Sequence, residues 1–92
     1  MMEIGEHKFS RITIDYEKTG SELKKVRELK KMSIPLVARH VGKSTQLIYD
    51  WEKGSSRIGL DDFVRICGLY KIRPEMVMCK KKETGVYYDY DE

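Results

Sequence analysis

The sequence has little cysteine and no long apolar run. Cys67 and Cys79 are the only two cysteines in 92 residues, and neither has the spacing of a metal site. We expect two free thiols rather than a disulfide, because a reducing cytosol disfavours disulfide formation. No segment approaches the roughly 18 apolar residues of a membrane-spanning helix, and no signal-peptide pattern opens the chain. These absences argue against a membrane protein and favour a cytoplasmic location.

A catalytic constellation is also lacking. His7 and His40 lie far apart in the sequence, and the seven glycines are scattered instead of forming a phosphate-binding loop. Asp61 and Asp62 lie where a helix is expected to begin, and carboxylates there favour the helix dipole. We therefore expect no enzyme activity, no bound metal or cofactor, and no small-molecule ligand.

The charge that is present is unevenly distributed. Residues 21–82 contain 15 Lys and Arg against 7 Asp and Glu, a net charge of +8. Residues 1–20 have a net charge of −1, and residues 83–92 have a net charge of −4, so the whole chain carries +3. A basic middle segment suggests a polyanionic partner, although an ordinary solvated surface would also carry such charge.

The two ends of the chain do not have a helical pattern. "RITIDYE" alternates apolar and polar residues, which is typical of a strand. "GVYYDYDE" is rich in aromatic residues and is either a second short strand or a frayed acidic tail. The chain thus divides into an arm or strand at 1–18, a helical domain at 19–79, and an aromatic, acidic tail or strand at 80–92.

The middle segment predicts five helices joined by short loops. Thr19 and Glu22 have the spacing of a capping box, which predicts that the first helix begins at Thr19. Pro35 fits the first turn of the second helix, and Gly42 fits its end. The predicted helices begin at or next to Thr19, Ser33, Ser44, Leu60 and Pro74. The expected fold class is all-α, with short terminal strands as the uncertain addition.

The second and third predicted helices are each about two turns long, and Gly42 lies in the short connector between them. Helices joined this tightly cross steeply, as in a helix-turn-helix, in which the second helix enters the DNA major groove. Ile48 and Trp51 would hold this helix to the core, and its polar side chains would face outward. These patterns predict base-reading residues Ser44, Thr45, Gln46, Tyr49 and Asp50, and phosphate-binding residues Ser33, Lys43, Lys53 and Arg57.

Residues from Thr19 to about Met78 resemble the lambda-repressor-like, Cro/XRE-type helix-turn-helix family. The matching positions are Arg27, Ala38, Val41, Gly42, Ile48, Trp51, Glu52 and Gly54. The resemblance implies a five-helix bundle that binds double-stranded DNA, usually as a homodimer on a palindromic site. It also implies a structural ion pair between Arg27 and Glu52.

Together these features predict a sequence-specific DNA-binding transcriptional regulator, more specifically a repressor. The alternative is a protein-interaction regulator on the same fold, such as an antitoxin or anti-repressor, which the acidic aromatic end would serve. A homodimer with reading helices roughly 34 Å apart would give the DNA-binding protein useful specificity. Its interface is expected at the last helix, with Val77 and Met78, or at the terminal strands, with Ile12, Ile14, Tyr87, Tyr88 and Tyr90.

Overall fold

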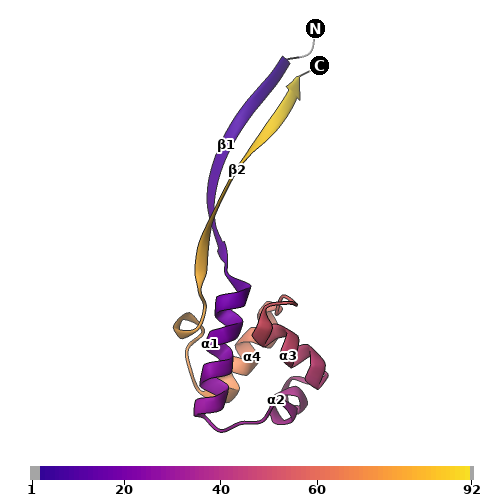
Figure 1. Cartoon of the computed structure of the whole chain (residues 1–92), viewed down its shortest axis with the longest axis vertical. Coiled ribbons are helices and arrows are strands. Elements are labelled where there is room, and N and C mark those ends of the chain that lie inside the picture. The colour runs from indigo at the N-terminus through magenta and orange to yellow at the C-terminus, as the bar shows by residue number, and fades with distance from the viewer. Residues whose placement is uncertain (1–2, 92) are drawn as a thin grey trace.

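The computed structural model describes residues 3–91, and within them it contains four α-helices and two long strands (Figure 1). The elements, in chain order, are β1 (Glu3–Ile14), α1 (Tyr16–Leu29), α2 (Ile34–Val41), α3 (Thr45–Lys53), α4 (Leu60–Tyr70), the 3₁₀ turn η1 (Pro74–Met76) and β2 (Lys80–Asp91). The helices form one body, and the strands leave it side by side.

The caps of α2 and α3 follow directly from the sequence. The hydroxyls of Ser33 and Ser44 accept hydrogen bonds from the backbone N–H groups of Leu36 and Leu47. Gly42 and Gly54 end the two helices with φ values of 69° and 78°, in the left-handed region that glycine enters without strain. The predicted starts of both helices and the predicted end of α2 at Gly42 are therefore confirmed.

The predicted start of the first helix is wrong. Helix α1 begins at Tyr16, because the Asp15 side chain caps it by accepting a hydrogen bond from the Lys18 N–H. Thr19 lies inside the helix and is buried, and its hydroxyl accepts a 2.9 Å hydrogen bond from the backbone N–H of Cys79, which follows η1. The Thr19–Glu22 pattern thus serves a contact between distant segments instead of a capping box.

The hydrophobic core lies among the four helices. Its buried members are Leu23, Val37, Ala38, Val41, Ile48, Trp51, Phe63, Ile66, Cys67, Tyr70 and Val77. Ile48 and Trp51, the two residues predicted to hold the third helix to the core, are among them, and so is Val77, which was expected at the dimer interface. Helix α4 continues to Tyr70, and Lys71 adopts the left-handed conformation at its C-cap.

The expected all-α, five-helix fold needs correction. The segment after Pro74 forms only the 3₁₀ turn η1, and both chain ends are strands of 12 residues. The strands pair antiparallel along their whole length, from Glu3 opposite Asp91 to Ile14 opposite Lys80. Each strand supplies the other's backbone partners, and a local pattern in one strand does not reveal such a long-range pairing.

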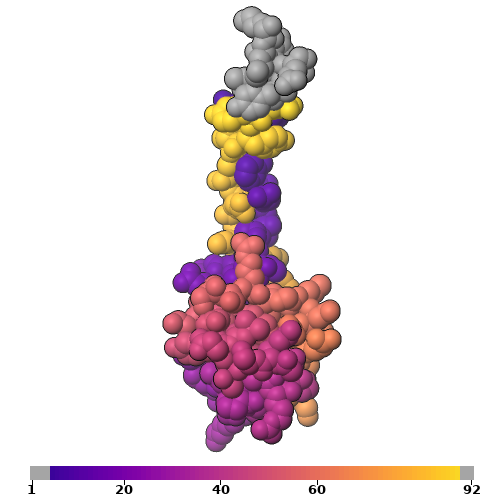
Figure 2. All heavy atoms as spheres, turned by 90° about the vertical axis from the view of Figure 1, so that its right-hand side faces the viewer, coloured from indigo at the N-terminus to yellow at the C-terminus, as the bar shows by residue number. Residues whose placement is uncertain are grey.

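The two strands form a ribbon that stands away from the helical body (Figure 2). The molecule measures 63 × 23 × 18 Å, and its long dimension follows the ribbon. We call the end near Glu3 and Asp91 the ribbon tip, and the end near Ile14 and Lys80 the ribbon base. Among residues 3–91, no helix has both the length and the apolar character needed to cross a membrane.

Candidate nucleic-acid interface

Helices α2 and α3 pack against the core through one face each and leave the other face open. Val37 and Ala38 anchor α2, while Ile48 and Trp51 anchor α3, and all four are at most 5% exposed. The connector between Gly42 and Ser44 is too short for α3 to run back alongside α2, so the two helices cross steeply (Figure 1). The first turn of α3 consequently projects from the body with its polar side chains outward.

The five predicted base-reading residues lie on or next to this outward side of α3. Thr45, Gln46 and Tyr49 are exposed, and Asp50 is half-buried. Gln46 Nε2 donates a 3.0 Å hydrogen bond to Asp50 Oδ1, so these two side chains form one polar unit. Ser44 is exposed, but its hydroxyl already caps the helix. An exposed amide beside a carboxylate can present both donors and acceptors to the edge of a base.

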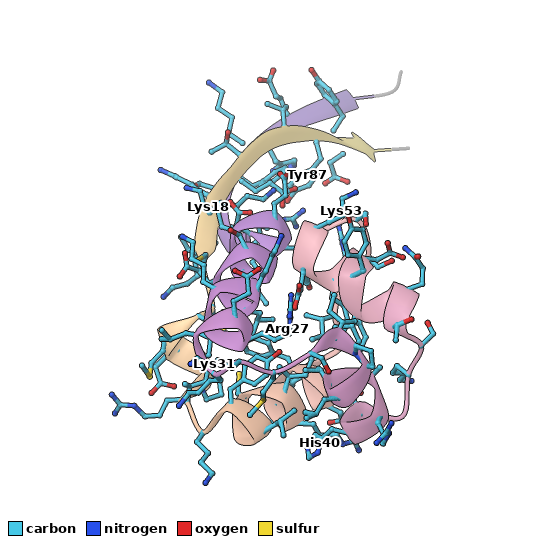
Figure 3. The ribbon with its side chains drawn as sticks, turned by 60° about the horizontal axis from the view of Figure 1, so that its bottom comes forward. Lys18, Arg27, Lys31, His40, Lys53 and Tyr87 are labelled. Carbon is cyan, nitrogen blue, oxygen red and sulfur yellow. The ribbon has the colours of Figure 1, made fainter. Side chains whose placement is uncertain are left out.

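The four predicted phosphate-binding residues are spread over the start of α2, the connector, the end of α3 and the loop after it. Ser33 and Lys43 are exposed at the start of α2 and just before α3. Lys53 is exposed at the far end of α3, on the side of the ribbon (Figure 3), and Arg57 is exposed in the loop that follows. The structure therefore does not bring the four residues into one cluster, but it does place cations on either side of the outward face.

A concave surface at the ribbon base joins Lys53 and Arg57 to Lys81. Asp15 and Glu17 also line it, so its charge is mixed. Lys81 was not predicted for this surface, because it lies 24 residues beyond Arg57 and approaches it only through the return of β2. The run of three lysines at 80–82 was the signal that could have pointed to it.

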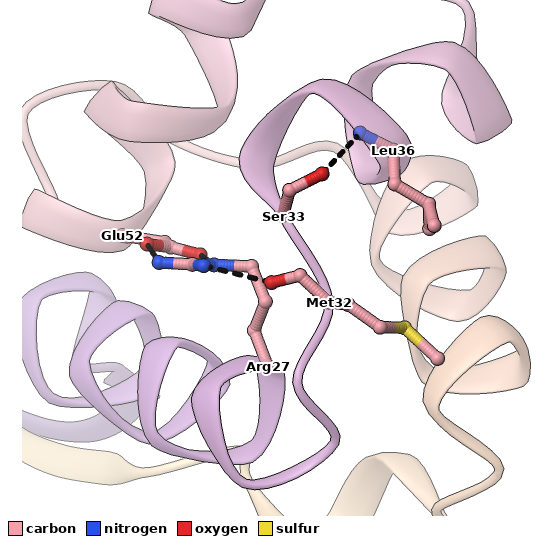
Figure 4. A network of polar contacts seen from close by, with 5 residues as sticks. All are labelled: Arg27, Met32, Ser33, Leu36 and Glu52. Atoms are coloured by element: carbon pink, nitrogen blue, oxygen red, sulfur yellow. Dashed lines mark hydrogen bonds and ion pairs between the residues drawn. The ribbon is translucent and has the colours of Figure 1, made fainter.

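Arg27 and Glu52 form a buried ion pair between α1 and α3 (Figure 4). Arg27 Nε donates to Glu52 Oε2 at 2.6 Å and Nη2 donates to Oε1 at 3.0 Å, which is a bidentate arrangement. Arg27 Nη1 also donates to the Met32 carbonyl at 3.0 Å. The hydrogen bond to Glu52 raises the pKa of the Arg27 guanidinium above its ordinary value.

This pair fixes the position of the outward helix. Arg27 points from α1 toward α3 in the interior of the helical body (Figure 3). One guanidinium holds the C-terminal half of α3 through Glu52 and the start of the α2 segment through Met32. Because its donors are engaged within the protein, Arg27 acts here as a structural link between the three helices.

Comparison with solved structures identifies proteins with the same fold. The restriction-modification controller protein C.AhdI from Aeromonas hydrophila is 22% identical and superimposes with a TM-score of 0.64, over 68% of this chain and 96% of that chain. The clp gene regulator ClgR from Corynebacterium glutamicum is 18% identical and gives a TM-score of 0.65, over 67% of this chain and 66% of that one. At such identities the likeness shows the fold alone.

No curated protein matches the sequence at a significant level. Residues 23–77, which are more than half of the chain, match the helix-turn-helix family. The match spans the region from α1 through η1 and includes the α2–α3 pair with its caps and its outward face. The chain therefore belongs to the Cro/XRE-type helix-turn-helix family.

Proposed function

We propose that the protein is a sequence-specific, double-stranded DNA-binding transcriptional regulator, acting as a repressor, and that α3 reads the major groove. The observation that carries this proposal is the outward first turn of α3, where Thr45 and Gln46 are exposed at the end of a helix anchored by buried Ile48 and Trp51. A protruding helix of this kind fits the width of the major groove.

The charge around α3 supports the proposal. Lys43 precedes the helix and Lys53 ends it, so cations flank the base-reading side chains along the direction in which phosphates line the groove. The exposed N-terminus of α2, capped by Ser33, offers backbone N–H groups and a favourable dipole to a further phosphate. The two proteins of similar fold are described as a restriction-modification controller and a gene regulator, which agrees with a regulatory role.

Base reading is tested by replacing Gln46. Gln46→Ala removes an amide that can form hydrogen bonds with N6 and N7 of adenine, so binding to the preferred site should weaken by about 1–3 kcal/mol. The variant should also accept other bases at one position of the site. The preferred site is first selected from random DNA, and affinities are then measured on it and on scrambled DNA.

Lys43→Ala is the matched control for Gln46→Ala. A phosphate contact carries no sequence information, so this variant should weaken binding to both DNAs alike. It should also reduce by about one the number of counterions released on binding, which is read from the salt dependence of the affinity. If Gln46→Ala behaved in the same way as Lys43→Ala, Gln46 would not be a base-reading residue.

The protein-interaction alternative rests on the ribbon, which projects from the body with an aromatic and acidic tip. A salt series on random DNA separates the two functions, because binding through phosphates weakens steeply as salt rises. Absence of any DNA binding at low salt would favour the protein-interaction regulator. For the DNA-binding function we further propose a homodimer, since one short reading helix covers only a few base pairs.

A further inference from the structure

The two faces of the ribbon differ in how far the protomer itself covers them. Residues opposite each other in the register share a face, and successive residues alternate between faces. Odd-numbered residues form one side, which we call the odd face, and even-numbered residues form the even face. The question is which of these faces is left for a partner.

The side chains of the odd face contact one another, while Tyr87 among them keeps 55% of its surface exposed. His7 and Tyr87 stack with ring centroids 4.8 Å apart, and Arg11 lies 4.8 Å above the ring of Phe9. Phe9 also lies over Gly85, where an added Cβ would come within 2.6 Å of the ring. Arg11 completes the row with a 3.0 Å ion pair to Glu83. This face already has contacts along most of its length.

The even face leaves its apolar side chains in solvent. Ile12 is 66% exposed, Val86 is 45% exposed and Tyr88 is 55% exposed. The ribbon has only two strands, and a two-stranded ribbon is at best marginally stable in water unless a hydrophobic face is covered. Among the described residues, Ile12, Val86 and Tyr88 make none of the stacking, cation–π or ion-pair contacts that join the side chains of the odd face.

Charge along the ribbon points to the partner. On the even face, the tip half (Glu3–Lys8 with Val86–Asp91) carries Glu6 and Lys8, and the base half (Phe9–Ile14 with Lys80–Gly85) carries Lys80 and Lys82. A second ribbon running in the opposite direction would set Glu6 of each copy against Lys82 of the other. The Lys8–Val86 row would meet the uncharged Ser10–Thr84 row.

We propose that the even face of the ribbon binds the even face of a second copy, antiparallel, with the two-fold axis at the Phe9–Gly85 row. In this arrangement the Glu6–Tyr88 row of one copy meets the Ile12–Lys82 row of the other, twice in each dimer. Where these two rows meet, the Glu6 carboxylate lies close to the Lys82 ammonium group. Tyr88 of one copy lies close to Ile12 of the other. The contact is isologous, as a two-fold dimer requires.

At the other candidate for the dimer contact, Val77 is 3% exposed and belongs to the core of its own protomer, and Met78 is half-buried against that core. The paired ribbons, by contrast, would keep the helical bodies at opposite ends, where they do not collide. A strip of about 35 × 10 Å gives roughly 350 Å² on each side, well below a standard interface, so the dimer is expected to be weak.

The test reverses the charge of Glu6 or of Lys82, which face each other across the proposed dimer. Self-association is measured by sedimentation without DNA. Glu6→Lys and Lys82→Glu each replace two attractive contacts by two repulsive ones, so each variant alone should dimerise about tenfold more weakly. An equimolar mixture of the two variants restores both attractions and should dimerise as the wild type does. The double variant Glu6→Lys/Lys82→Glu should do the same.

Lys81→Glu is the matched control, because Lys81 is adjacent to Lys82 but lies on the odd face. The same charge change at this position should leave dimerisation unchanged. Circular dichroism and the fluorescence of buried Trp51 check that every variant is folded. A monomeric wild type, failure of the mixture to recover, or an equal effect of Lys81→Glu would each overturn the proposal. The inference specifies the homodimer of the proposed function, and since no DNA is present its failure is distinct from a failure of DNA reading.

Discussion

At the scale of single residues, the Arg27–Glu52 pair is the contact on which the geometry of α3 depends most. Both side chains are nearly buried, with 11% and 5% of their surfaces exposed. A buried pair of this kind adds little net stability over an apolar pair of the same size, but the loss of one partner leaves an uncompensated charge. Its contribution is therefore to position and specificity more than to the free energy of folding.

We predict that Glu52→Met or Arg27→Met alone lowers the free energy of unfolding by about 3–5 kcal/mol. The double variant should lose much less than the sum of the single losses, because no charge is then left buried. Urea denaturation followed by Trp51 fluorescence measures all three, as a double-mutant cycle. Additive losses within about 0.5 kcal/mol would show that the two groups do not interact energetically.

At the scale of elements, α1 and α3 cross so closely that one position admits only glycine. A Cβ added at Gly20 would lie 2.2 Å from the Trp51 carbonyl oxygen and 2.7 Å from that of Glu52. Both atoms belong to the backbone of α3, so a rotamer change cannot relieve the overlap. Gly20 lowers the intrinsic helix propensity of α1, and in return it lets the buried ion pair and the Trp51 ring sit between the two helices.

We predict that Gly20→Ala destabilises the protein by several kcal/mol, as overpacking at a helix crossing does, although alanine is the better helix former. Gly68→Ala is the matched control, since Gly68 is exposed in α4 and an added Cβ meets nothing within 4 Å. This control should stabilise by up to about 1 kcal/mol through helix propensity. Thermal melts should show a lower melting temperature for Gly20→Ala and a higher one for Gly68→Ala. The same change in both variants would contradict the close crossing of α1 and α3.

At the scale of the whole molecule, the ribbon would set the distance between the two α3 helices in the proposed homodimer. A rise of about 3.4 Å per residue makes each ribbon roughly 37 Å long, which leaves about 26 Å of the 63 Å length for the helical body. Antiparallel ribbons joined at the Phe9–Gly85 row would then place the centres of the two bodies about 60 Å apart. This separation is closer to two helical turns of DNA, about 68 Å, than to one.

We therefore predict tightest binding to two half-sites whose centres lie about 20–21 base pairs apart, instead of the single turn expected from the sequence. The measurement is a mobility shift on duplexes that carry the selected half-site at spacings of one, one and a half, and two turns. Glu6→Lys should remove the preference for spacing while leaving binding to a single half-site intact. A preference for one turn would contradict the ribbon-mediated arrangement.

The helix-turn-helix itself could be predicted from local patterns in the sequence. Ser33, Ser44, Gly42 and Gly54 act within a few residues of their own positions, so the sequence is enough to predict the ends of α2 and α3. The spacing of Ile48 and Trp51 likewise identifies the buried face of α3, and with it the outward face that carries Thr45 and Gln46.

Contacts between distant segments were decided only by the tertiary structure. Thr19 has the spacing of a cap, yet its hydroxyl bonds the Cys79 backbone, and Asp15 caps α1 in its place. Lys81 joins Lys53 and Arg57 only because β2 returns to the ribbon base. The strand at each end could be read as a short arm or a tail until the full register showed 12 residues paired with 12. A periodic pattern specifies which face of a segment is apolar, whereas its partner depends on the path of the whole chain.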